Sequence, residues 1–237
     1  PSFLARVGGV MLSPVETFES IARRPDVLFP LLAIVIISII TGTIVASQVD
    51  FEPIARETME QQSAGRPAPP PEQFDRGVKF MAGFWKALAY ASPVFSIVIF
   101  GLIAGVLLLA FRLFGGEGNF KQAFSITLYA WIPLLIKGII ATIVLTTREN
   151  LTLMDLQNPV RSNLGFLVEG KSQPFAFALL SSVDVLTIWA LVLFILGFSA
   201  MSRFSRVKSA VVVLSLWAVT LLLKLGGAAM QAARIQS

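Results

Sequence analysis

The chain has 237 residues, of which 55% are hydrophobic and 14% are charged, with a mean hydropathy of +0.77. A soluble domain of this size could not bury so much apolar surface in one core, so lipid must cover the surplus. The 19 Lys and Arg exceed the 14 Asp and Glu by five charges, and they lie mostly between apolar runs, as residues that set membrane topology do. Nucleic-acid binding needs a contiguous basic face on a soluble module, so we expect no nucleic-acid partner.

The sequence contains neither cysteine nor histidine. The absence of cysteine excludes disulfides, thiolate nucleophiles and zinc-thiolate sites. The absence of histidine removes the commonest general base and the commonest transition-metal ligand. We therefore expect no catalytic residue, no metal site and no cofactor, and we expect that the protein is not an enzyme.

Residues 1–25 have the pattern of two short amphipathic helices. The second begins at Pro14, where Ser13 and Glu16 have the spacing of a capping box. Phe18 and Ile21 then share one face of that helix. We expect this segment to lie at the membrane surface or to pack on the bundle, rather than to bind a partner.

Five apolar runs follow, and each is long enough to cross about 30 Å of hydrocarbon at about 1.5 Å per residue. Because backbone groups in lipid must be hydrogen-bonded within the segment, runs of this length are helices. The sequence predicts an all-α fold: a polytopic transmembrane helix bundle with about five spans, in a membrane domain over residues 26–237. The predicted spans are 28–47, 88–114, 123–146, 175–201 and 207–227.

The connections between these runs differ in length and charge. Two are tight, at 115–122 and 202–206, and two are long, at 48–87 and 147–174. The tight connections carry most of the nearby basic residues: Arg112, Lys121, Arg203, Arg206 and Lys208. Since Lys and Arg close to helix ends favour the cytoplasm, we expect a cytoplasmic N-terminus, two long outer loops and a C-terminus outside.

The first long loop has helical patterns of its own. Its first half places apolar residues on one face of a helix that starts near Pro53. In its second half Phe74, Val78, Met81 and Trp85 keep helical spacing toward Leu88 in the second span, so we expect that span to begin early.

Three stretches resemble the Yip family of polytopic membrane proteins, which is named for interaction with Ypt/Rab GTPases. They are the turn and helix start Gly115-Gly-Glu-Gly-Asn-Phe-Lys-Gln-Ala-Phe124 with Tyr129-Ala-Trp-Ile-Pro133, the N-terminal Met11-Leu-Ser-Pro-Val-Glu-Thr-Phe18, and Asp184-Val-Leu-Thr-Ile-Trp189 with Gly197.

This resemblance implies a five-span domain with a cytoplasmic N-terminus. Eukaryotic relatives are linked to vesicle traffic and bind Rab proteins, often through a long N-terminal extension that this chain lacks, so we do not expect a Rab-type GTPase partner. The chain looks like a bacterial-type member, which implies an inner (plasma) membrane location. Some bacterial relatives look like accessory proteins of membrane transporters.

Two ionisable residues lie within the predicted spans, Lys137 in the third and Asp184 in the fourth. Each lies about nine residues from the outer end of its span, so antiparallel neighbours would place them at one depth. A charge at membrane depth costs about 2.5–3.5 kcal/mol or more, so each needs a partner or water. We expect a structural ion pair, with a proton or ion relay as the functional alternative. Lys224 lies close enough to the outer end of the fifth span to snorkel.

Two further patterns are candidates for helix packing and helix bending. Gly101 and Gly105 form a G-x-x-x-G pattern that permits close helix approach, within the bundle or to another subunit. Pro93 and Pro133 lie near the starts of the second and third spans and would kink them, either as a gate or as ordinary membrane-helix prolines.

Two functions from different classes remain open. The first is a non-enzymatic scaffold or accessory subunit that binds other membrane proteins through its apolar faces and outer loops. The alternative is a transporter of small solutes, lipids or ions with a polar site near Lys137 and Asp184.

Overall fold

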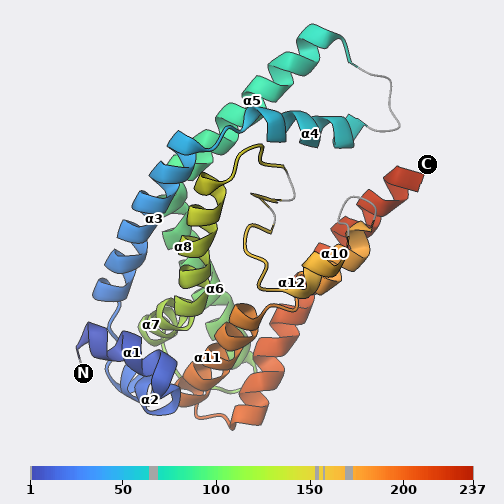
Figure 1. Ribbon diagram of the computed structural model, residues 1–237. Helices are drawn as coiled ribbons and strands as arrows, with labels where there is room; N and C mark the ends of the chain where they lie inside the picture. Colours follow the sequence, from blue (N-terminus) through green and yellow to red (C-terminus); the bar gives the residue numbers. More distant parts are fainter. Residues whose placement is uncertain (1, 64–68, 153–154, 157, 169–172, 237) are drawn as a thin grey trace. The chain divides into compact units, whose positions relative to one another are not determined.

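The computed structural model describes residues 2–63, 69–152, 155–156, 158–168 and 173–236 (Figure 1). Four helices are long and apolar enough to cross a membrane: α3 (Leu28–Gln48), α6 (Ser92–Leu113), α11 (Val185–Ser202) and α12 (Arg206–Gln236). The pair α7 (Phe120–Ala130) and α8 (Ile132–Thr147) passes the same test together, with a bend of 44°. The predicted all-α membrane bundle of about five spans is therefore confirmed.

The chain divides into two compact units. The first unit comprises residues 1–38, 93–137 and 185–220, and the second comprises 39–92, 138–184 and 221–237. Helices α3, α8 and α12 each run from one unit into the other.

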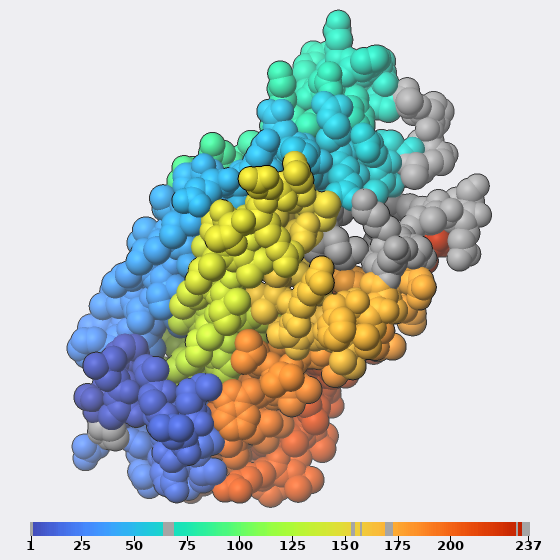
Figure 2. Space-filling view, viewed as in Figure 1, coloured from blue at the N-terminus to red at the C-terminus, as the bar shows by residue number. Residues whose placement is uncertain are grey.

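The first unit has its core where the N-terminal helices meet the membrane helices. Helices α1 (Phe3–Leu12) and α2 (Pro14–Arg23) pack on α7 and α11. Val10, Phe18 and Ile21 are fully buried in the resulting core. Figure 2 shows the dark blue N-terminal residues in contact with the orange residues of α11. The N-terminal segment thus packs on the bundle, which was one of its two expected locations.

Gly197 of α11 allows this close packing. A Cβ at this position would lie 2.9 Å from Cδ1 of Phe18 in α2 and would also collide with Cγ2 of Ile126 in α7. Both neighbours are fully buried. Three helices therefore converge at a point where only hydrogen fits in place of a side chain.

Polar contacts hold the start of α7 against the N-terminal segment. Asn119 and Gln122 form a capping box, in which each side chain accepts from the other's backbone N–H at 3.0 Å. The Gln122 amide also donates to the Ala22 carbonyl at 2.7 Å, and the Ser125 hydroxyl donates to the Asp26 carbonyl at 2.7 Å. The same residues therefore begin α7 and satisfy carbonyl groups at the end of α2 and just beyond it.

The second unit contains a helical hairpin made of α4 (Glu52–Ser63) and α5 (Pro71–Tyr90). Its core consists of seven buried apolar residues: Val49, Phe51, Ile54, Ala55, Val78, Ala82 and Leu145. Beyond this core the second unit holds the short 3-10 helix η1 (Leu164–Leu167), which packs against α10 (Pro174–Leu180).

Three predicted spans are shorter or less continuous in the structure than in the sequence analysis. The segment 123–146 is bent at Trp131, between α7 and α8. The segment 88–114 is divided at Ala91, between α5 and α6, because Pro93 has no N–H to donate to the Ala89 carbonyl and its ring clashes with that group in a continuing helix. The segment 175–201 is divided at residues 181–184, between α10 and α11. Here Asp184 lies directly before the first turn of α11, where a carboxylate is favoured by the helix dipole.

Candidate functional site

Asp184 lies at the break in the fourth predicted span and is 1% exposed. Its backbone forms an isolated antiparallel bridge with Asn163, and its carboxylate accepts a hydrogen bond from the Ser162 hydroxyl. A buried carboxylate is costly unless hydrogen bonds satisfy it. The long loop that the sequence placed outside the bundle therefore supplies a polar contact to the start of a membrane helix.

Asn163 holds that loop in position and is itself buried. Its amide group exchanges two hydrogen bonds with the Asn158 amide, at 2.7 and 3.3 Å, and its Oδ1 also accepts from the Gly165 backbone at 2.9 Å. These contacts fix residues 158–165 beside the break. Several hydrogen bonds therefore hold the loop that surrounds Asp184.

Lys224 brings a cation to the same break. Its Nζ donates to the hydroxyls of Ser181 and Ser182, both at 2.9 Å. The sequence analysis treated Lys224 only as a snorkelling residue. Its position near the C-terminal end of the predicted fifth span, at the level of two serines near the N-terminal end of the predicted fourth span, is the signal that would have identified it.

We refer to Asp184, Ser162, Ser181, Ser182 and Lys224 as the turn cluster. It combines a carboxylate, an ammonium group and three hydroxyls within one short turn and the two segments that contact it. Hydroxyls both donate and accept hydrogen bonds, so they can hold either charge state of a neighbouring group. The cluster therefore has the group types that a proton relay or a polar ligand would need.

Lys137 is a half-buried residue of α8. It belongs to the first compact unit, whereas Asp184 belongs to the second. Pairing between these two residues therefore stays a prediction.

The glycines and prolines singled out in the sequence fall on two helices of the bundle. At Gly101 and Gly105 of α6, a Cβ would meet no atom of the described residues within 4 Å, so both glycines face open space. Pro93 lies in the first turn of α6, two residues after the break at Ala91. Pro133 lies two residues after Trp131, where α7 and α8 bend by 44°.

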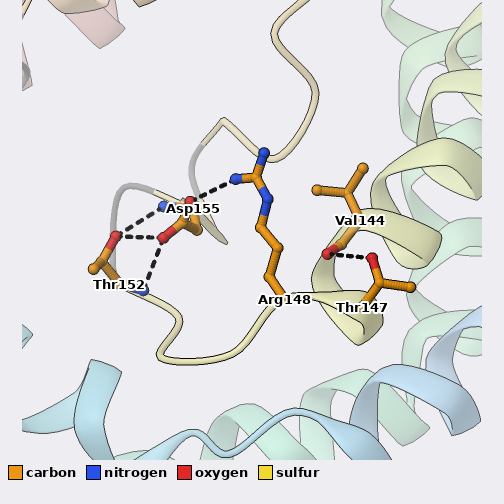
Figure 3. Close-up of polar contacts among 5 residues, drawn as sticks. All are labelled: Val144, Thr147, Arg148, Thr152 and Asp155. Carbon is orange, nitrogen blue, oxygen red and sulfur yellow. Dashed lines mark hydrogen bonds and ion pairs between the residues drawn. The ribbon is translucent and has the colours of Figure 1, made fainter.

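A separate polar contact orders the loop that follows α8 (Figure 3). The Asp155 carboxylate accepts from the Thr152 hydroxyl at 2.7 Å, from the Thr152 backbone at 3.0 Å and from Arg148 at 2.9 Å. Burial acts to raise the pKa of Asp155, but the Thr152 hydrogen bonds and the Arg148 charge outweigh it, so the pKa lies below its usual value.

Basic residues gather at the turn between α6 and α7. Arg112 donates to the Gly118 carbonyl at 2.8 Å, Lys208 donates to the Phe114 carbonyl at 3.1 Å, and Arg203 pairs with Glu117 at 3.1 Å. A cavity of about 350 Å³ opens beside this turn, and α2, α7 and the end of α11 also line it. Residues that the positive-inside rule counts therefore also fix the shape of the turn.

Among the residues that the structure describes, no group of three or more acidic side chains is arranged to hold a metal ion. Comparison with curated proteins and with solved structures gave no match. Comparison with protein families matched the Yip1 domain over residues 8–226, which is nearly the whole chain. This helical membrane protein therefore belongs to the Yip1 domain family.

Proposed function

We propose that the protein is a non-enzymatic scaffold or accessory subunit of a larger membrane protein complex. The observation that carries this proposal is the open face of α6, where Gly101 and Gly105 expose the backbone to an approaching helix. Small residues four apart allow two membrane helices to come close enough for extensive van der Waals contact. The flanking residues Leu102, Val106 and Leu109 are 62, 53 and 60% exposed and would form the rim of that contact.

Co-purification from native membranes in mild detergent tests this proposal. We expect Gly101→Leu and Gly105→Leu to remove a stoichiometric partner without lowering the thermal stability of the isolated protein. Gly138→Leu is the matched control, because a Cβ at position 138 of α8 would also meet no described atom within 4 Å, and that position lies on another helix. A protein that stays monomeric and without partners in mild detergent would contradict the proposal.

We further propose a bacterial inner membrane as the location, with a cytoplasmic N-terminus and an external C-terminus. The basic residues around the α6–α7 turn support this orientation. Because the chain has no cysteine, single cysteines at Glu117 and Gln61 can each be labelled uniquely. In intact cells a membrane-impermeant maleimide should label position 61 and leave position 117 unmodified; the reverse pattern would contradict this orientation.

The turn cluster favours transport of a small solute, lipid or ion as a second candidate function. A buried carboxylate linked to hydroxyls, with an ammonium group at the same turn, supplies polar groups within an apolar bundle. In reconstituted vesicles, Asp184→Leu combined with Lys224→Leu should abolish flux while the helix content stays unchanged. Unchanged flux in a well-folded double variant would remove this candidate.

A further inference from the structure

The hairpin of α4 and α5 follows directly after the apolar span α3, and contacts within the second unit fix its depth relative to the end of that span. A Cβ at Gly42 of α3 would collide with the Ala89 carbonyl and the Ser92 hydroxyl. Gly42 lies six residues before the end of the α3 span. At about 1.5 Å per residue, the last turn of α5 therefore lies about 9 Å inside that end.

The end of the α3 span also gives the depth of the aromatic residues of α5, which lie near the membrane surface. The rings of Phe51, just past the end of α3, and Trp85 in α5 have centroids 6.4 Å apart. Phe84 is next to Trp85, and Phe80 is one helical turn farther from the membrane, about 6 Å along the axis. The polar headgroup layer is about 5–7 Å thick on each side of the hydrocarbon, so both phenylalanines fall within it or at its edges.

These aromatic residues are exposed although they are apolar. Phe80 is 78% exposed, Phe84 is 55% exposed, and Leu88, one turn closer to the membrane, is 39% exposed. Their spacing of four residues places Phe80, Phe84 and Leu88 on one face of α5, which we call the ridge. Along the chain, the ridge is followed directly by the apolar span α6.

A groove of about 430 Å³ opens beside this ridge, between α4 and α5. Gly77 of α5 lines this groove and has no side chain that would fill it. The lining is mostly apolar and flexible, and it includes Thr58, Met59, Phe80, Met81, Phe84 and Trp85. Methionine side chains adapt to irregular apolar partners.

We propose that this groove binds an acyl chain of a phospholipid from the adjacent leaflet, with Phe80 and Phe84 as its lipid-facing wall. The groove lies at the level of the headgroup layer, its lining is apolar, and it opens beside the ridge. These three properties match an acyl chain that enters from the bilayer rather than a ligand that enters from water. Charge along α5 matches a headgroup above that chain. The acidic Glu72 and Asp75 lie farther from the membrane than the ridge. The exposed Lys79, next to Phe80, lies at the headgroup level, and the exposed Lys86 lies deeper and can extend its ammonium group toward lipid phosphates.

The test uses the absence of cysteine, which makes every introduced cysteine a unique labelling site. The full chain is reconstituted in phosphatidylcholine vesicles whose acyl chains carry bromine, a contact quencher of fluorescence, and a bimane fluorophore is attached at one position. Thr58→Cys reports from inside the groove and Phe84→Cys reports from its outer wall. Glu60→Cys is the matched control, because it lies two residues along the same helix and is exposed on another face.

Brominated lipid should quench most of the fluorescence at positions 58 and 84 and leave position 60 unchanged. Gly77→Leu should then abolish quenching at position 58 but not at position 84. This variant fills the groove, because its Cβ would start 2.6 Å from the flexible end of Met59. Equal quenching at positions 58 and 60, or no quenching at position 58, would overturn the proposal, and neither result depends on the folding of Gly77→Leu. No quenching at position 58 in this partner-free system would indicate that the groove binds a protein partner instead.

Discussion

The junction at Gly197 makes the sharpest quantitative prediction. In Gly197→Ala the new methyl group must fit against Phe18 and Ile126, which are both fully buried and cannot move into solvent. Overpacking of this kind costs about 1–3 kcal/mol. Replacing a mid-helix glycine with alanine returns about 1 kcal/mol of helix propensity. We expect a net loss of up to about 2 kcal/mol of unfolding free energy, combining these two effects.

Thermal unfolding in detergent, followed by circular dichroism, measures this loss. For a chain of this length, each kcal/mol lowers Tm by about 2–4 °C, so the expected decrease in Tm is up to about 8 °C. Gly105→Ala is the control, because a methyl group there meets no described atom within 4 Å. It should keep or slightly raise Tm.

A double-variant cycle identifies the clash as the cause. Ile126→Ala alone should be destabilising, by about 2–5 kcal/mol, because it leaves a cavity. In that background the methyl group of Gly197→Ala fills part of the cavity and should be neutral or stabilising. If Gly197→Ala lowers Tm equally in both backgrounds, or if it matches Gly105→Ala, the packing argument is refuted.

Three further variants test the polar contacts. Asp155→Asn should destabilise the loop after α8 by about 0.5–1 kcal/mol, since the Arg148–Asp155 ion pair is partly exposed. Because the pKa of Asp155 is depressed in the folded state, the wild-type contribution should be present at neutral pH and be lost as pH falls through that pKa. Faster amide exchange at Thr152 would show this loss. Asp184→Leu should cost about 1–3 kcal/mol by removing the hydrogen bond between the part-buried Ser162 hydroxyl and this carboxylate, and unchanged thermal stability would contradict this role. Gln122→Ala should cost about 1–2 kcal/mol through loss of half a capping box and of the bond to Ala22, and protease resistance of α2 equal to wild type would contradict it.

The spans could be predicted because their signal is local. A continuous apolar run of sufficient length has no stable alternative to a helix in lipid, so α3, α6 and α12 follow from composition alone. The helix boundary before Pro93 is also local, because proline cannot donate the backbone hydrogen bond that a continuing helix needs.

The break at residues 181–184 depended on partners far away in the chain. Ser181, Ser182 and Asp184 interrupt an apolar run only mildly, and nothing near them marks the end of a helix. Their partners are Ser162 in the preceding loop and Lys224 in the last span. A count of depth along an assumed continuous span therefore placed Asp184 inside the membrane helix, whereas the structure places it at the start of one.

The destination of the N-terminal helices could not be predicted for a similar reason. The spacing of Phe18 and Ile21 identified the apolar face of α2. The surface that receives this face is built from α7 and α11. A site composed of three separate segments leaves no pattern in any one of them.

This arrangement has a consequence for how the protein is made. Phe18 cannot reach its final contact until Gly197 has been synthesised, about 180 residues later. At about 5–20 residues per second, the ribosome needs about 10–35 s to cover that distance. During this interval α11 is missing from the surface on which α2 packs, and an amphipathic helix without its full partner surface can rest on the membrane surface. We therefore expect the two locations predicted for the N-terminal segment to be successive stages of its biogenesis, with insertion of the fourth span moving it from one to the other.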